Sequence, residues 1–134
     1  MKDLFSKIIA GEIPSEKVYE DDKTYAFLDI NPTNFGHTLV VPKNCSENIY
    51  DITDEDWVAI MRTVRMLAPK IKEALGAEGI NIIMNNEQPA GQIVPYTHVH
   101  IIPRYKTDGF KHWKGVPYQE GEITKVGKKI RMSL

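Results

Sequence analysis

Apolar residues recur at helical spacing in some segments of the chain, whereas other segments are short and rich in β-branched residues. The strongest helical pattern begins at Thr53, which can cap the helix, and runs to Gly76, where it should end. Pro69 should kink or split this helix, because its ring removes a backbone hydrogen bond. A shorter amphipathic helix is predicted over residues 3–10, and a short C-terminal helix is compatible with the pattern from Gly121 onward.

The short β-branched segments predict strands that are separated by turn residues. The first two should form a hairpin that turns at residues 20–23, and residues 31–36 and 85–92 have the composition of loops. Strands interspersed with helices and joined by short turns indicate an α+β fold around an antiparallel sheet. The predicted strands cover residues 17–19, 24–29, 37–41, 80–84 and 96–103.

Composition places this chain of 134 residues among ordinary globular proteins, because 42% of its residues are hydrophobic and 26% are charged. We expect a single domain over residues 1–134. The net charge is −1, with both signs mixed along the chain, so we expect neither nucleic-acid nor membrane binding. A lone Cys45, a charged N-terminus and no apolar run of about 18 residues indicate a cytoplasmic protein.

Two histidines two residues apart are the first candidates for chemistry. On a strand, alternation puts Tyr96, His98 and His100 on one face and turns Thr97 and Val99 toward a core. Two histidines on one face could bind a metal, act as a base and its partner, or act as a nucleophile and its neighbour. They could also be ordinary hydrogen-bonded histidines, and their spacing alone does not decide.

The polar loop before these histidines favours a functional interpretation. Gly91 would let a backbone approach a ligand closely, and successive N–H groups there could form an anion-binding nest. A neutral imidazole beside such a nest could attack phosphorus, because its ordinary pKa is about 6.5. The alternative is a solvated turn.

The run from Gly91 to Ile102 resembles the signature of the histidine triad (HIT) family, in which three alternating histidines precede two apolar residues. Further segments, in the right order, resemble the Hint-like branch of that family. They are residues 5–14, 20–22, 27–30 and 36–43. The resemblance implies a central antiparallel sheet of about five strands with two main helices, a homodimer, and no cofactor.

The resemblance also implies roles for individual residues. His98 matches the histidine that attacks the α-phosphate, and His100 matches the third histidine, which helps to hold the phosphate. Asp29 matches the carboxylate that binds the ribose hydroxyls, although by itself it could be a turn residue. The remaining matches are a base slot of Leu4, Phe5, Ile8, Phe27, Leu28 and Ile30, the phosphate-side residues Asn85, Gly91, Gln92 and Val94, and His37 beside the catalytic strand. Each apolar residue of the slot could instead belong only to the core.

The sequence departs from the family pattern at the first triad position, which is Tyr96. Many bacterial relatives bind a structural zinc through positions that match Asp3, Ser6, Cys45 and Tyr96, and none of these keeps the family ligand. Because a structural zinc site needs about four N, S or carboxylate ligands, we expect that this site was lost as a unit and that the chain binds no metal. Ile93 also replaces the hydroxyl residue that is frequent at its position.

The expected function is therefore a nucleotide hydrolase or transferase that acts on a purine nucleotide through a nucleotidyl-histidine intermediate, as in nucleoside phosphoramidases. Three alternatives stay open at this point. They are a dinucleoside polyphosphate hydrolase, a nucleotide-binding regulatory protein without significant turnover, and a zinc-binding protein that uses His98 and His100.

Overall fold

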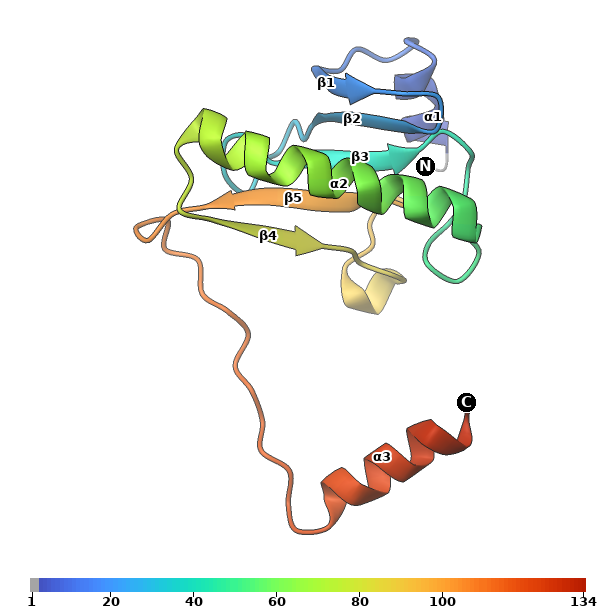
Figure 1. Cartoon of the computed structure of the whole chain (residues 1–134), viewed down its shortest axis with the longest axis vertical. Coiled ribbons are helices and arrows are strands. Elements are labelled where there is room, and N and C mark those ends of the chain that lie inside the picture. The colour runs from blue at the N-terminus through green and yellow to red at the C-terminus, as the bar shows by residue number, and fades with distance from the viewer. Residues whose placement is uncertain (1–2) are drawn as a thin grey trace.

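A five-stranded antiparallel sheet forms the centre of the molecule (Figure 1). The computed structural model describes residues 3–134. The strands lie in the order β1, β2, β3, β5, β4, so the two halves of the chain meet where β3 pairs with β5. This confirms the predicted α+β fold. The elements are α1 (Asp3–Ile9), β1 (Lys17–Glu20), β2 (Thr24–Leu28), β3 (Thr38–Pro42), α2 (Asp54–Leu75), β4 (Gly79–Ile83), the 3₁₀ turn η1 (Gln88–Ala90), β5 (Val99–Arg104) and α3 (Glu122–Met132).

The long helix α2 covers one face of the sheet (Figure 1). Ile60 and Val64 on α2 pack against Val40, Val99 and Ile101, which alternate with outward-facing neighbours on β3 and β5. All five side chains are almost completely removed from water. Each such burial contributes about 1.5–3 kcal/mol, so this layer is the rigid base on which the opposite face is built.

The ends of α2 follow the sequence signals. Thr53 caps the helix by accepting a hydrogen bond from the Asp56 backbone N–H at 3.2 Å, and Gly76 ends it in the left-handed conformation. The expectation that Pro69 could split the helix is wrong, because α2 is continuous through it. The carbonyl that loses its partner belongs to Arg65, which lies with Pro69 on the exposed side of the helix, where water can replace the bond.

The opposite face of the sheet carries α1 and a second, smaller apolar cluster. Phe5 and Ile8 of α1 pack over Phe27 of β2, Leu39 of β3 and Tyr96. Because side chains alternate along a strand, Leu39 faces α1 while its neighbour Val40 faces α2. The sheet therefore separates two apolar layers, of which the α1 layer is the thinner.

The last predicted strand begins later than expected. β5 starts at Val99, so Tyr96, Thr97 and His98 precede the ladder, and the other strand ends differ from prediction by at most one residue. Thr97 instead donates its backbone N–H to the Ser46 carbonyl at 2.8 Å, which anchors this segment to the loop after β3. The predicted common side still holds, because the ring of Phe5 packs edge-on against both Tyr96 and His98.

The C-terminal residues 111–134, called the arm below, extend away from the rest of the chain and end in α3 (Figure 1). Gly121 is the N-cap of α3, which confirms the helix considered from Gly121 onward. None of the residues in α3 is buried. Within residues 3–134, no helix combines the length and the apolar character that crossing a membrane requires.

Candidate active site

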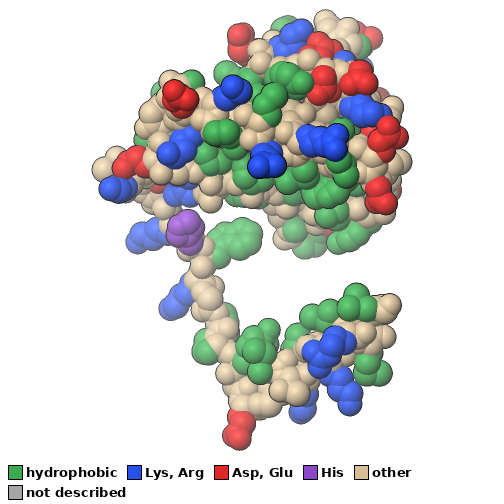
Figure 2. All heavy atoms as spheres, in the orientation of Figure 1, with side chains coloured by type: hydrophobic (Ala, Val, Ile, Leu, Met, Phe, Trp, Pro, Cys, Tyr) green, Lys and Arg blue, Asp and Glu red, His purple; other side chains and the backbone are tan. Residues whose placement is uncertain are grey.

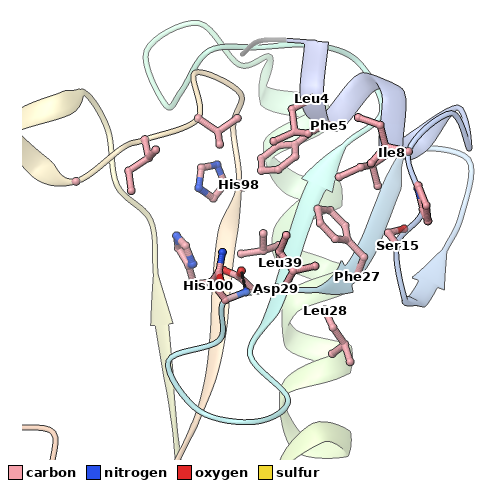
Figure 3. Close-up of a pocket in the computed structure, with 17 residues that line it drawn as sticks. Leu4, Phe5, Ile8, Ser15, Phe27, Leu28, Asp29, Leu39, His98 and His100 are labelled. Atoms are coloured by element: carbon pink, nitrogen blue, oxygen red, sulfur yellow. Dashed lines mark hydrogen bonds between the residues drawn. The ribbon is translucent and has the colours of Figure 1, made fainter.

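A cavity of about 390 Å³ opens between α1, the ends of β2 and β5, and the loop before the two histidines (Figure 3). This volume is in the range of small-molecule sites. The structure thus brings together most residues that the sequence nominated from distant segments. Those lining the cavity are Leu4, Phe5, Ile8, Phe27, Leu28, Asp29, Ile30, Gly91, Val94, His98 and His100.

The apolar half of the cavity is a slot under α1. Phe5 and Phe27 meet edge to face with ring centroids 5.6 Å apart, and Ile8 and Leu39 extend the same surface (Figure 3). Flat apolar walls of this kind favour a planar, weakly polar group.

Sequence reasoning missed six residues that line the cavity. For Leu39 the signal was available, because strand alternation opposite Val40 places it on the α1 side. The segment after α1 gave no such signal, since it turns back over the slot through a hydrogen bond from the Ile13 N–H to the Lys7 carbonyl. The missed residues are Ile13, Pro14, Ser15, Asn31, Leu39 and Ile93.

His98 is held in one tautomer by the backbone. Its Nδ1 lies 2.6 Å from the Tyr96 carbonyl, which can only accept, so Nδ1 carries the proton. In the neutral ring Nε2 then has a free lone pair. The side chain is buried and lines the cavity, with its ring 4.9 Å from that of His100. His98 is thus set to react through Nε2.

His37 and His100 form a second defined pair. The Thr33 N–H donates to His37 Nδ1 at 3.1 Å, so in the neutral ring the proton sits on Nε2. His37 Nε2 then donates to His100 Nδ1 at 2.9 Å, which leaves the proton of His100 on its own Nε2. Across residues 3–134, His100 Nε2 is the one buried side-chain N or O atom without a hydrogen-bond partner. A buried N–H without a partner indicates a place for a ligand acceptor.

Burial keeps all three rings neutral. Desolvation lowers the pKa of His98 and of His37, against an opposing effect of the Asp29 carboxylate. Desolvation, followed by the neighbouring His98 and His37, lowers the pKa of His100 to about 4. Because an imidazole must be neutral to be nucleophilic, the lowered pKa of His98 favours the form of the ring that can attack.

Asp29 follows β2 and points into the cavity near His100 (Figure 3). Its Oδ1 accepts the Asn31 N–H at 2.9 Å, and its Oδ2 lies 3.8 Å from His37 Nε2. A carboxylate has about four acceptor positions, so Asp29 can still accept two hydroxyl groups of a ligand.

Three predicted site residues do not line the cavity: His37, Asn85 and Gln92. His37 does not reach the cavity and contacts it only through its hydrogen bond with His100. The Gln92 amide donates to the Glu47 carbonyl at 2.6 Å and accepts the Glu87 N–H at 2.8 Å, so it pins the loop from inside. The Asn85 amide lies beside Gly91, 3.6 Å from where a Cβ there would be.

The loop backbone differs from the predicted anion nest. The N–H groups of Ala90, Gly91 and Gln92 are bonded within the loop, to carbonyls of residues 87 and 88. Ile93 and Val94 border the cavity, and no described residue accepts their N–H groups. Donors for an anion are therefore available at Val94, as the resemblance implied, and at Ile93, but not at Gly91 or Gln92.

One group of side chains could hold a metal, because ligand atoms of Asp29, His37 and His100 lie within 4.8 Å of one another. Binding there would need lone pairs on both His37 Nε2 and His100 Nδ1, which already share a proton. The proton of His37 would have to move to Nδ1, against the N–H of Thr33. The hydrogen bonds therefore favour the histidine pair over a metal.

Comparisons with known proteins agree with this geometry. Residues 10–107 match the HIT domain family. The protein hit of Bacillus subtilis is 50% identical over 108 residues, which are 80% of this chain and 74% of that protein.

The chain belongs to the HIT family.

Two further HIT proteins are similar over nearly the whole chain. Adenosine 5'-monophosphoramidase hnt1 of Schizosaccharomyces pombe is 36% identical over 132 residues, 97% of this chain and 96% of that protein. The crystal structure of a HIT family member from Bacillus subtilis superposes with a TM-score of 0.90 at 41% identity and covers 98% of this chain and 96% of its own.

The side chain of Tyr96 belongs to the packed interior of this HIT protein. It is fully buried, and its hydroxyl donates to the Pro42 carbonyl at 2.5 Å at the end of β3. Burial raises the pKa of the phenol, so it stays protonated. Asp3, Ser6 and Cys45, the other positions of the family zinc site, are exposed, and the Tyr96 hydroxyl is already committed to the backbone.

Tyr96→Phe should lower the free energy of unfolding by about 1–3 kcal/mol, because the buried Pro42 carbonyl loses its main donor. Urea titrations would measure this as a lower midpoint at constant slope. The matched control is Tyr118→Phe on the exposed arm, which should leave the midpoint unchanged. Equal midpoints for both variants would contradict the structural role of Tyr96.

Proposed function

We propose that this HIT protein is a nucleotide hydrolase that acts at the α-phosphate and uses His98 Nε2 as its nucleophile. One observation carries the proposal. The lone pair of His98 Nε2 and the unpartnered N–H of His100 border the same cavity, on rings 4.9 Å apart. A nucleophile beside a buried donor suits attack on phosphorus, because the donor stabilises charge on a phosphoryl oxygen.

The substrate class follows from the two halves of the cavity and from a relative. The slot under α1, which Phe5 and Phe27 line, suits a purine base, and Asp29 can accept both ribose hydroxyls. The relative from Schizosaccharomyces pombe is named an adenosine 5'-monophosphoramidase. This supports a purine nucleoside phosphoramidate as the substrate.

The reaction proceeds as two displacements. The lone pair of His98 Nε2 forms a bond to the α-phosphorus while the bond to the leaving group breaks, and the leaving group departs with that electron pair and takes a proton from solvent. Water then attacks phosphorus, the P–N bond breaks, and the imidazole recovers its lone pair. The water loses one proton to solvent, so the net products are a nucleoside monophosphate and the protonated leaving group.

In both steps the protein holds protons in place. The Tyr96 carbonyl keeps the proton of His98 on Nδ1 and stabilises the positive charge that develops on the ring. His100 Nε2 and the N–H groups of Ile93 and Val94, on residues that line the cavity, are the donors proposed to bind the phosphoryl oxygens.

Dinucleoside polyphosphates are the second candidate substrates. Ile30 and Ile93 line the mouth of the cavity and are 87% and 82% exposed, which leaves room for a leaving group as large as a nucleotide. Comparison of kcat/KM for the two substrate classes would separate them. The alternative of a nucleotide-binding regulatory protein without significant turnover rested on Tyr96 at the first triad position. It loses this support, because the buried hydrogen bond of Tyr96 accounts for the residue in structural terms.

His98→Ala should abolish phosphoramidate turnover while AMP affinity stays within a few-fold, because the slot and Asp29 remain intact. A coupled assay and calorimetry would measure the two quantities, and mass spectrometry of quenched wild-type protein should show a nucleotidyl group on His98. His112→Ala, on the exposed arm, is the control and should keep full activity. Substantial turnover in His98→Ala would show that another group attacks phosphorus.

Asp29→Ala should weaken AMP binding about ten- to a hundred-fold, since loss of a charge-assisted hydrogen bond costs about 1.5–3 kcal/mol. Calorimetry would give the affinities. The matched comparison keeps the protein unchanged and uses 2′,3′-dideoxy AMP, which should bind wild type as weakly as AMP binds the variant. Equal wild-type affinity for both nucleotides would exclude a ribose contact at Asp29.

The same proposal includes a homodimer in which the arm of each chain packs on the body of the other chain, residues 1–110. α3 presents Ile123, Val126 and Ile130 along one exposed side at helical spacing, and Figure 2 shows hydrophobic side chains exposed along this helix. The arm also carries six Lys or Arg and two acidic residues, whereas residues 1–110 carry eleven and sixteen. A basic, amphipathic arm thus complements the acidic body of a second copy.

Ile123→Asp with Ile130→Asp should shift the protein from dimer toward monomer, because two charges would enter the proposed apolar contact. Light scattering after size exclusion would report a mass of about twice 15.3 kDa for wild type and a lower mass for the variant at the same concentration. Gln119→Ala on the same arm is the control and should stay dimeric. A monomeric wild type would refute the arrangement.

A further inference from the structure

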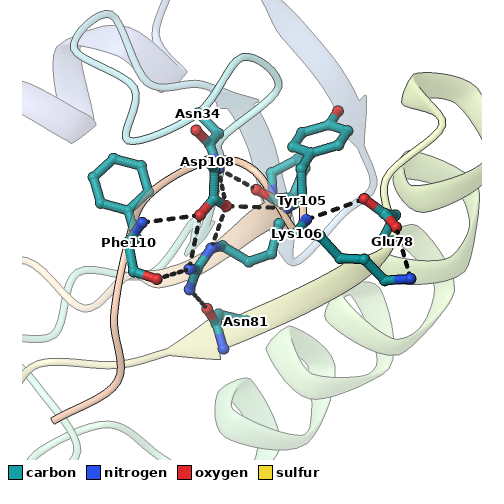
Figure 4. A network of polar contacts seen from close by, with 9 residues as sticks. Asn34, Glu78, Asn81, Tyr105, Lys106, Asp108 and Phe110 are labelled. Carbon is teal, nitrogen blue, oxygen red and sulfur yellow. Dashed lines mark hydrogen bonds and ion pairs between the residues drawn. The ribbon is translucent and has the colours of Figure 1, made fainter.

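The Asp108 carboxylate lies outside the cavity and collects hydrogen bonds from three separate parts of the chain (Figure 4). Arg104 donates to both of its oxygens, at 2.7 and 3.1 Å, and the Tyr105 and Phe110 N–H groups donate at 3.0 Å each. The Asn34 amide adds a further bond at 3.0 Å. The Asp108 side chain is 6% exposed, so its charge is buried, and both of its oxygens accept hydrogen bonds.

Asn34 connects this carboxylate to the loop that precedes His37. Its amide donates to both Asp108 and the Pro103 carbonyl, which fixes the side chain in one orientation. The backbone carbonyl of Asn34 accepts the backbone N–H of His37 at 3.0 Å. The loop is also held at Gly36, whose φ is +93° and where a Cβ would lie 2.0 Å from a Leu75 methyl group.

The loop in turn determines which nitrogen of His37 carries the proton. The Thr33 N–H faces His37 Nδ1 only while the loop keeps its present shape. If that donor moved away, His37 could shift its proton to Nδ1. His100 Nδ1 would then face a lone pair, and His100 could restore the bond only by moving its proton from Nε2 to Nδ1. The N–H that faces the cavity would be lost.

We propose that Asp108 is a positioning residue that acts through Asn34 and Thr33 to keep the proton of His100 on Nε2. Asp108 touches neither the cavity nor the histidines, so its effect is on tautomers and not on contacts with a ligand. The effect on turnover rests on the proposed function above, whereas the effect on tautomers does not. At metal sites, groups that orient the residues bound to the ion change activity by about 10–100-fold when they are removed, and we expect an effect at the lower end of this range here.

Nitrogen-15 NMR of the histidine rings in the full chain tests this directly. In wild type we expect protons on His37 Nε2, His98 Nδ1 and His100 Nε2, and His112 on the exposed arm serves as a solvent-exposed reference. Asn34→Ala, which keeps the charged pair of Asp108 and Arg104, should give mixed tautomers at His37 and His100 and leave His98 unchanged. Asp108→Asn should do the same more strongly.

The pKa of His37 gives a second readout. The titratable groups that face it are Asp29 and His100, with His98 beyond, and none of them is altered in these variants. Opening of the loop should raise the pKa of His37 toward its ordinary value, because burial is what lowers it. Turnover should show about a tenfold fall in kcat with KM within about threefold.

Glu78→Gln is the matched control. Glu78 accepts the Lys106 N–H at the same corner of the molecule and makes no contact with the loop before His37 (Figure 4). It should leave the tautomers, the pKa of His37 and kcat unchanged. A folded Asn34→Ala protein with wild-type tautomers would overturn the proposal. Shifted tautomers in a protein whose wild type shows no turnover would instead refute only the proposed function.

Discussion

Two neutral imidazoles that meet at 2.9 Å share one proton, and the direction of that hydrogen bond decides what the site presents to a ligand. His37 donates to His100 because the Thr33 N–H occupies its other nitrogen. In the alternative direction the proton of His37 would sit on Nδ1, face to face with the proton of the Thr33 N–H. Burial favours the neutral forms, so the direction persists over the pH range in which both rings stay unprotonated. The backbone N–H of Thr33, at one end of this series of hydrogen bonds, therefore determines that His100 carries its proton on Nε2, at the other end.

The sheet places this hydrogen-bond chain at the boundary between two unlike layers. On the α2 side, Ile60 and Val64 fill the space over β3 and β5, which makes a dry core with little freedom. On the other side α1 is only seven residues long and covers the sheet partly. The space that it leaves uncovered is the cavity, with an apolar slot under Phe5 and with the polar groups of Asp29, His98 and His100 at the end of β2 and the start of β5. The candidate site thus lies where the fold has too few apolar side chains to cover this face of the sheet.

The sequence predicted what depends on local pattern and on spacing, and it missed what depends on tertiary contact. Helical spacing and the Thr53 cap located α2, and alternation placed His98 and His100 on one side of the sheet. Gln92 was assigned to the loop beside the phosphate, but its side chain bonds to the Glu47 carbonyl of a loop 45 residues away. No local pattern indicates such a contact. The continuity of α2 through Pro69 likewise depends on which side of the helix faces solvent.

Tyr96, two residues before the proposed nucleophile His98, shows how the backbone and the side chain of one residue can serve different purposes. The carbonyl of Tyr96 fixes the tautomer of His98, and any residue at this position supplies that carbonyl. The phenol points the other way, to the end of β3, where it satisfies the Pro42 carbonyl inside the protein. A change of side chain at position 96 can therefore exchange a metal ligand for a structural hydrogen bond without disturbing His98 Nε2, the proposed nucleophile. The orientation of His98 depends on the path of the main chain between Pro95 and Val99, and this path is held by Thr97 and Ser46.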